Sequence, residues 1–329
     1  MKVCYIYRKN GARSIERVFA QIRKAMGGGV EQSEVRCTNR NLYNPFTYIM
    51  NIFECRRNKS DVYHIVGEIH YAALFFGRSK TIVTVHDLGH FFRKTGVVGF
   101  ILRCLYAHLP LRWAKHIVAI SNFSKNEIVE RVGVSPEKIS VIYDPAPDWF
   151  EFSPKKLDLH CPTILCFCHM KNKNLTGIIN AVKGLNCRLR IIGRIPESDR
   201  ELLEEYKISY SNDFDISGGQ IIEEYKNCDI LLFPSTYEGF GVPVLEAQLT
   251  GRPVITSDIE PLTEVAGDAA VFVNPFDSDS IRSGIVRLTE NPDLSSELVK
   301  KGLENAKRFS PKLIASQYLE MYGKIAKSK

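Results

Sequence analysis

The sequence predicts an α/β protein with two Rossmann-like, doubly wound domains that face a cleft. Three observations support this prediction. The chain has 329 residues, which is enough for two hydrophobic cores. Short apolar runs alternate with segments of helical periodicity in both halves, as expected for parallel sheets. A Pro-rich stretch over 146–162 predicts a linker between an N-terminal domain over 1–145 and a C-terminal domain over 163–310.

The first half begins with a strand over 2–7. A helix follows, because apolar residues recur at helical spacing: Ile15, Val18, Phe19, Ile22 and Met26. Apolar runs predict further strands over 61–67, 81–87, 117–121 and 139–143, with a helix over 121–131. Ligands of a parallel sheet bind beyond the carboxyl ends of its strands, so polar residues at those ends are candidates for a site.

The segment over 91–115 is apolar and aromatic and carries Arg93 and Arg103. The pattern favours a helix packed in the core. It also fits an amphipathic helix that lies on a bilayer. Flotation with anionic liposomes would separate these two interpretations.

The second half repeats the alternation of strand and helix. Strands are predicted over 163–168, 188–193 and 228–233, helices over 174–185, 197–207, 219–227 and most of 277–309, and a loop over 256–262.

Composition and charge narrow the possible partners and location. No apolar stretch reaches the ~20 residues of a membrane span. The apolar run at the N-terminus is too short for a signal peptide. Nine Cys without CxxC pairs predict free thiols in a reducing cytoplasm. Residues 1–145 hold 22 Lys and Arg against 11 Asp and Glu, a net charge of +11. Nucleic acid, an anionic membrane surface and a phosphorylated acceptor would each suit that charge.

The stretch over 234–246 predicts a strand, a tight turn and a helix that Pro243 opens. The N–H groups at the start of that helix form a ready phosphate site; they belong to Gly239, Phe240, Gly241 and Val242. Glu238 and Glu246 flank the turn, where they can reach past a phosphate to sugar hydroxyls. The alternative is an ordinary αβ connection with two surface glutamates.

Other candidates follow other strands. His86 and Asp87 come directly after the strand over 81–85, and Lys173 follows the strand over 163–168, where it can neutralise a diphosphate. Gly11, in the turn after the first strand, is assigned with Asp87 to the acceptor side. A structural histidine and a solvated lysine are the alternatives. His86, Asp87 and His90 resemble metal ligands by type, but no cluster of further ligands accompanies them, so no metal site is predicted.

The stretch over 234–247 resembles the signature of retaining, nucleotide-sugar-dependent glycosyltransferases of family 4, which have the GT-B fold. The resemblance continues through 251–257 and 261–270, and more weakly through 114–125, 136–143 and 309–322. It implies that Glu238 orients the transferred sugar, Glu246 holds the ribose, Lys173 receives the diphosphate and His86 lies near the sugar. It also implies that no metal or other cofactor is required, and that the helix over 311–329 packs back on the first domain.

One departure from the family pattern concerns the segment over 171–175. The family usually has an Arg-Lys-Asn-Leu run there, preceded by a Gly and often by a further Arg. This chain keeps Lys173, but Asn172 stands in place of the Arg. Lys171 and His169 are both candidates to replace it, and the departure points either to weaker binding of the donor or to an unusual donor.

The resemblance implies transfer of a hexose from a nucleotide diphosphate sugar to an acceptor hydroxyl, in polysaccharide or glycolipid biosynthesis. The expected acceptors are glycans, glycolipids or polyprenyl-linked sugars rather than nucleic acid. The expected location is cytoplasmic, with peripheral contact to an anionic membrane face. Two alternatives stay open: an impaired relative that only binds or scaffolds, and a nicotinamide-dependent oxidoreductase. No GxGxxG follows the first strand, which disfavours the oxidoreductase.

Overall fold

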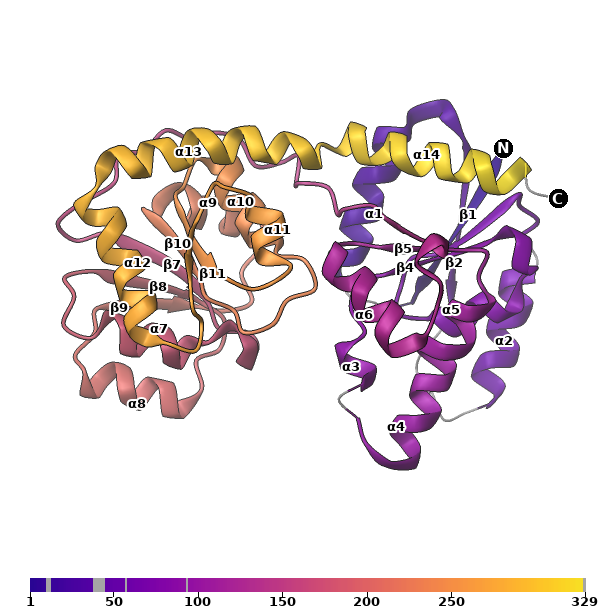
Figure 1. Ribbon diagram of the computed structural model, residues 1–329, viewed down its shortest axis with the longest axis horizontal. Helices are drawn as coiled ribbons and strands as arrows, with labels where there is room; N and C mark the ends of the chain where they lie inside the picture. Colours follow the sequence, from indigo (N-terminus) through magenta and orange to yellow (C-terminus); the bar gives the residue numbers. More distant parts are fainter. Residues whose placement is uncertain (10–12, 38–44, 57, 93, 328–329) are drawn as a thin grey trace. The chain divides into compact units, whose positions relative to one another are not determined.

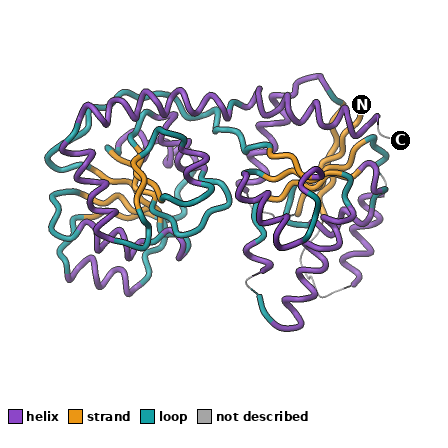
Figure 2. The backbone as a smooth tube through the Cα atoms, in the orientation of Figure 1, coloured by secondary structure: helices purple, strands orange, loops and turns teal. Residues whose placement is uncertain are grey.

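The computed structural model describes residues 1–9, 13–37, 45–56, 58–92 and 94–327 (Figures 1 and 2). The chain forms two compact units. The first consists of Met1–Pro145 together with Phe309–Lys329, and the second of Ala146–Arg308. Each unit contains one parallel six-stranded sheet covered by helices, which confirms the predicted α/β fold class.

The sheet of the first unit has the strand order β2-β1-β3-β4-β5-β6. Side chains of β1 alternate between its two faces. Val3 and Tyr5 belong to the core that α1 and α14 cover, whereas Cys4 and Ile6 belong to the core on the opposite face. The strands are β1 (Lys2–Arg8), β2 (Glu31–Cys37), β3 (Val62–Ile65), β4 (Thr81–Val85), β5 (His116–Ala119) and β6 (Ile139–Val141).

The last helix of the chain, α14, belongs to the first unit and contacts α1. The hydroxyl of its Tyr322 lies 2.7 Å from Nδ1 of His64, and Nε2 of His64 lies 2.7 Å from Oγ1 of Thr84. Burial, with a smaller contribution from His86, lowers the pKa of His64 to about 3, so this ring is neutral. The helices are α1 (Arg13–Met26), α2 (Pro45–Arg56), α3 (Gly89–Phe92), α4 (Gly96–Arg103), the π-helix η4 (Cys104–His108), α5 (Leu109–Trp113), α6 (Asn122–Val132) and α14 (Pro311–Lys327).

The sheet of the second unit has the order β12-β11-β10-β7-β8-β9. Its strands are β7 (Thr163–Phe167), β8 (Arg188–Ile192), β9 (Tyr210–Asp213), β10 (Ile230–Phe233), β11 (Val254–Ser257) and β12 (Val271–Val273). Its helices are α7 (Leu175–Val182), α8 (Glu197–Glu205), α9 (Gly218–Asn227), α10 (Val242–Thr250), α11 (Leu262–Ala266), α12 (Ser278–Glu290) and α13 (Pro292–Ala306). The central position of β10 and β7 places the ends of both strands beside each other.

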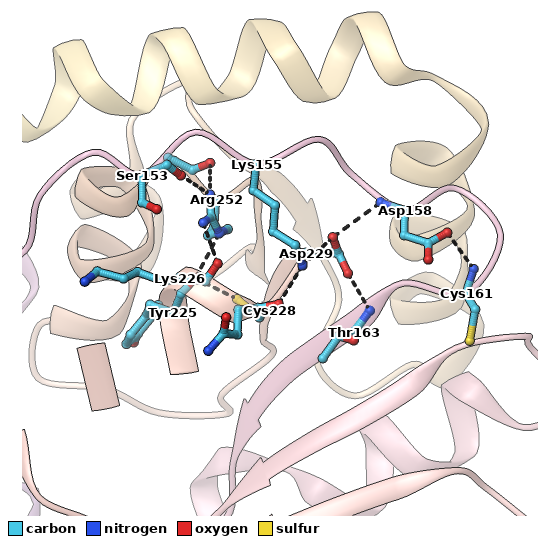
Figure 3. Close-up of polar contacts among 12 residues, drawn as sticks. Ser153, Lys155, Asp158, Cys161, Thr163, Tyr225, Lys226, Cys228, Asp229 and Arg252 are labelled. Carbon is cyan, nitrogen blue, oxygen red and sulfur yellow. Dashed lines mark hydrogen bonds and ion pairs between the residues drawn. The ribbon is translucent and has the colours of Figure 1, made fainter. Parts of the chain in front are cut away.

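Two buried charged side chains anchor the segment before β7 to the second unit (Figure 3). The guanidinium of Arg252 donates to the carbonyl oxygens of Ser153 at 2.8 Å, Tyr225 at 2.8 Å and Lys226 at 2.7 Å. The carboxylate of Asp229 accepts from the backbone N–H of Thr163 at 2.9 Å and pairs with Lys155 at 2.8 Å. The stretch that the sequence predicts as a linker is therefore packed on the second unit from Ser153 onward.

Some elements differ from the sequence-based prediction. The strand β2 is not predicted, because its residues are mostly polar. The predicted loop over 256–262 begins later, since Thr256 and Ser257 belong to β11. The segment over 91–115 forms several short helices: Tyr106 and Leu111 are buried, as a core helix requires, but α4 exposes most of its apolar side chains. Within the described ranges, no helix is long and apolar enough to cross a membrane.

Candidate functional site

The loop between β10 and α10 forms the centre of the candidate site. The strand is fully buried, and the chain turns over 234–241 before α10 begins at Val242. Gly241 has φ 115°, and a Cβ placed there would lie 2.6 Å from Cδ2 of Leu262. A side chain is thus excluded at this position by both backbone conformation and space. The turn brings the backbone to the start of α10, where first-turn N–H groups have no acceptor within the helix.

Lys173 and Glu238 form a largely buried ion pair beside this turn. Lys173 ends the short helix η6 (Lys171–Lys173) that follows β7, and its side chain is 5% exposed. Its Nζ lies 2.5 Å from Oε1 of Glu238, whose side chain is 11% exposed. The ammonium also lies 4.5 Å from the ring centroid of Phe233, the last residue of β10. The two candidates from separate segments therefore share one site.

Backbone and amide hydrogen bonds hold these two segments together. Asn172 donates from Nδ2 to the carbonyl oxygen of Tyr237 at 2.7 Å, and its own carbonyl accepts from the N–H of Thr236 at 2.8 Å. Nδ2 of Asn172 is also 3.4 Å from Oε1 of Glu238. Asn174 donates to the carbonyl oxygen of Pro234 at 3.2 Å. Asn172, which departs from the family pattern, thus contacts the loop over 234–241 that carries Glu238.

Glu246 lies in the second turn of α10, the helix that the glycine turn opens. Its Oε2 accepts a hydrogen bond from the hydroxyl of Tyr225 at 2.7 Å, and Tyr225 comes from α9. Burial, followed by the charge of Glu246, raises the pKa of Tyr225 well above its ordinary value, so the phenol stays protonated as a donor. Sequence reasoning missed Tyr225, because nothing in its local pattern distinguishes it from a core aromatic residue.

The other candidates lie in the first unit, at the end of β4. Nδ1 of His86 lies 3.5 Å from Oδ2 of Asp144, a buried carboxylate that the sequence analysis did not single out. Nε2 of His86 is buried and has no hydrogen-bond partner among the described residues. Asp87 accepts from the N–H of Gly89 at 2.6 Å, which closes the turn after the strand. The acceptor-side candidate Gly11 lies outside the described residues.

The described residues contain no group of three or more His, Cys, Asp or Glu placed to hold a metal ion. All nine Cys are free thiols. Among them, Sγ of Cys37 and Sγ of Cys55 approach to 3.4 Å without a disulfide.

The sequence is similar to several curated glycosyltransferases. The O-antigen chain mannosyltransferase RfbU of Salmonella typhimurium is 29% identical over 230 residues, which are 67% of this chain and 63% of that protein. The N,N'-diacetylbacillosaminyl-diphospho-undecaprenol alpha-1,3-N-acetylgalactosaminyltransferase of Campylobacter jejuni is 25% identical over 266 residues, 74% of this chain and 70% of that protein. The chain thus spans less than two thirds of the first of these relatives.

Solved structures with the same fold cover almost the whole chain. HepE of Anabaena in complex with UDP-glucose superposes with a TM-score of 0.79 at 16% identity, over 98% of this chain and 100% of that one. The lipopolysaccharide outer core galactosyltransferase WaaB, in its apo form, superposes with a TM-score of 0.72 at 17% identity, over 98% and 100%. At this identity the similarity establishes the fold.

Two families match consecutive parts of the chain. Residues 11–146 match Glycosyltransferase Family 4, and residues 157–305 match Glycosyl transferases group 1. The two matches lie in the first and second unit respectively. Because both halves match and the fold agrees, the chain belongs to the GT-B glycosyltransferases of group 1 and family 4.

Proposed function

We propose that this chain transfers a hexose from a nucleotide diphosphate sugar to an acceptor hydroxyl, with retention of configuration at the sugar. The observation that carries the proposal is the Lys173–Glu238 pair beside the turn that opens α10. A cation, helix N–H groups and a carboxylate are the groups needed by a leaving diphosphate and a sugar that is being transferred. Family membership supplies the reaction class.

In this proposal the negative charge of the departing diphosphate is received by Lys173 and by the amides over 239–242. Lys173 is held by its ion pair with Glu238, and the start of the loop is held by the bonds of Asn172 to Thr236 and Tyr237, so little reorganisation is needed when charge develops. Glu238 accepts from hydroxyls of the sugar and meanwhile keeps Lys173 in place. The carboxylate of Glu246 binds the ribose, and its bond to Tyr225 sets its orientation.

His86 is assigned to the sugar on the acceptor side. Its buried Nε2 has no hydrogen-bond partner in the part of the chain that the structure describes, and buried polar atoms are rarely left without one unless a ligand or water fills the position. Asp144, which is paired with the other ring nitrogen, would fix the orientation of the ring. A sugar hydroxyl is the partner that we assign to Nε2.

The proposed acceptor is a glycan, a glycolipid or a polyprenyl-linked sugar in polysaccharide biosynthesis. The relatives named above support this class, since one is an O-antigen chain mannosyltransferase and another acts on an undecaprenol-linked sugar by its name. Mannose and glucose are the first donor sugars to test. We place the enzyme in the cytoplasm, in peripheral contact with the membrane that holds a lipid-linked acceptor.

A panel of UDP, GDP and ADP with their sugars tests the proposal by thermal shift and by donor hydrolysis without acceptor. We expect one nucleotide to raise the melting temperature, and its sugar to be hydrolysed slowly. NMR of the product reports whether the anomeric configuration is kept, and activity in excess EDTA is expected to match activity without it. Binding without any hydrolysis or transfer would support the scaffold alternative instead.

Substitutions of single lysines test whether the nucleotides bind at the candidate donor site. Lys173→Met is expected to weaken nucleotide diphosphate binding about tenfold or more, since one buried cation is lost. Lys300→Met removes an exposed lysine of the same unit and serves as the control. Lys171→Met shows whether that neighbour replaces the family's missing Arg. Equal binding by the Lys173 and Lys300 variants would contradict the proposed donor site.

A further inference from the structure

An open hollow of about 770 Å³ lies at the edge of the first sheet where β4, β5 and β6 begin. These strands are parallel neighbours, so their amino ends meet at one edge. His86 follows the other end of β4, which is about 16 Å away at ~3.3 Å per residue. The hollow is therefore separate from His86, the candidate residue at the carboxyl end of β4. We call it the amino-edge hollow, and its walls include Arg78, Lys115, His116, Ser135, Glu137 and Lys138.

Positive charge dominates the amino-edge hollow. Arg78, Lys115 and Lys138 carry three positive charges, and Glu137 is the only acid among the lining residues, which leaves a net charge of 3 − 1 = +2. Glu137 accepts a hydrogen bond from Oγ of Ser135 at 3.1 Å. In the part of the chain that the structure describes, none of the three cations forms an ion pair. The three cations are thus available to an anion in the hollow.

The fold fixes the position of Lys138, which is half-buried. Its Nζ donates to the carbonyl oxygens of Leu111 at 2.9 Å and Arg112 at 2.7 Å. Burial, followed by the charge of Arg78, lowers the pKa of Lys138 to about 8. Burial, followed by the charge of Lys138, also lowers the pKa of His116. Positive groups from separate segments are therefore held close together at an electrostatic cost, which a bound anion would remove.

We propose that the amino-edge hollow binds a diphosphate group through Arg78, Lys115 and Lys138. Arg and Lys are the side chains that bind phosphate oxygens most strongly, Arg as a planar fork and Lys as a point charge. Three cations from three segments can each contact a different phosphoryl oxygen. A group with several negative charges therefore fits them better than a single carboxylate does. The proposal concerns the first unit alone and does not depend on the proposed sugar transfer.

Titration calorimetry of the full chain with inorganic pyrophosphate tests the proposal. It is done in about 0.15 M salt, where the screening length of ~8 Å suppresses long-range attraction. Because the proposed donor site also takes a diphosphate, each titration is repeated with Lys173→Met. We expect saturable binding with a Kd below about 1 mM in both chains, and no saturable binding of chloride at equal ionic strength. UDP and ADP in the Lys173 variant show whether the hollow also takes a diphosphate that carries a nucleoside.

Variants with opposite changes in charge identify the hollow. Arg78→Gln with Lys115→Gln removes two exposed cations and should weaken pyrophosphate binding about tenfold or more. Glu137→Gln removes the only acid of the lining and should tighten binding about two- to fivefold. Arg17→Gln with Lys24→Gln removes two exposed cations from α1, so it matches the first variant in net charge and should leave binding unchanged. Circular dichroism shows whether each variant is folded.

Hydrogen exchange locates the bound pyrophosphate without any variant. We expect slower exchange over 78–82 and 135–139, and this measurement on the wild-type chain decides the question if Lys173→Met does not fold, because Lys173 belongs to the other unit.

Three outcomes would overturn the proposal. The first is protection confined to the second unit, or binding that disappears in a folded Lys173→Met chain. The second is equal affinity of the wild type and the variant that lacks Arg78 and Lys115. The third is weaker or unchanged binding by Glu137→Gln. Donor hydrolysis is measured separately, so failure of this site and failure of the proposed transfer are distinguishable.

Discussion

At the scale of single residues, the main feature of the candidate site is the direct ion pair between Lys173 and Glu238. Each was chosen from its own segment of the sequence, as the cation of a diphosphate site and the carboxylate of a sugar site. Their direct pairing is not readable from the sequence, because the two residues are 65 positions apart and meet only when β7 and β10 lie side by side. The pair couples the two roles, because Glu238 holds in place the cation that is assigned to the diphosphate.

Glu238→Gln separates those roles. The amide keeps the shape of the side chain but loses the charge that both orients the sugar and holds Lys173. We expect turnover to fall about 10²–10³-fold, as for removal of one preorganised electrostatic group, while the Kd of the nucleotide diphosphate changes less than about threefold. Glu223→Gln, at an exposed glutamate of the same unit, is the control. A parallel loss of nucleotide binding and turnover would refute the role of Glu238 as the sugar ligand.

A second prediction at this scale concerns acid stability. His64 is inaccessible, and its folded-state pKa of about 3 lies below its ordinary value of 6.5. The unfolded chain therefore binds one more proton than the folded chain between these pH values. The contribution of His64 to the free energy of unfolding is fully present above pH 6.5 and falls by about 1.4 kcal/mol per pH unit below it. His64 alone should thus lower the free energy of urea unfolding of the first unit by about 2 kcal/mol between pH 7.5 and pH 5, so the total loss in the wild type is at least that large.

The variant His64→Gln removes this titration, so its loss over the same pH interval should be about 2 kcal/mol smaller. His160→Gln, at an exposed position, should behave like the wild type. Burial also lowers the pKa of His70, so some acid sensitivity is expected to remain in the His64 variant. An unchanged pH dependence in His64→Gln would mean that the unfolding of the first unit does not expose this ring.

At the scale of elements, the glycine turn before α10 is the most constrained piece of the site. Gly241→Ala places a Cβ in contact with Leu262 and in a backbone region that costs about 1–3 kcal/mol for other residues. We expect hydrogen exchange to show that the local stability of β10 and α10 falls by about that amount. We also expect weaker nucleotide binding. Gly219→Ala, in the first turn of α9 with open space around it, should leave stability unchanged or raise it by up to about 1 kcal/mol. Equal stability of the two variants would show that the turn tolerates a side chain.

Sequence patterns predicted elements well where burial governs their composition. The strand β10 is apolar throughout because both of its faces are covered, and it was predicted within two residues. The edge strand β2 has mostly polar residues, so no apolar run marks it. For the segment over 91–115 the sequence left a core helix and a bilayer-surface helix as alternatives, because an apolar stripe does not indicate whether the protein itself covers it. In the structure, α4 exposes most of its apolar side chains.

At the scale of the whole molecule, the first unit is assembled from two parts of the sequence that are separated by the second unit. Helix α14 supplies Ile314, Tyr318, Met321, Tyr322 and Ile325 to the core on one face of the first sheet. Each large side chain that is buried contributes about 1.5–3 kcal/mol relative to exposure. Five such residues give on the order of 10 kcal/mol as an upper estimate, which is comparable to the ~5–15 kcal/mol stability of a typical domain.

A fragment of residues 1–145 should therefore fail to unfold cooperatively by itself, because the part of the sheet face that α14 covers, including the side of His64 that contacts Tyr322, would be open to water. Adding a peptide of residues 309–329 should restore a cooperative thermal transition, with a midpoint that rises with peptide concentration by mass action. The same peptide with Tyr318→Ser and Tyr322→Ser is the control and should restore little. A native-like NMR spectrum of residues 1–145 without the peptide would show that α14 covers a core already complete without it, and that the two parts are not obligatory partners.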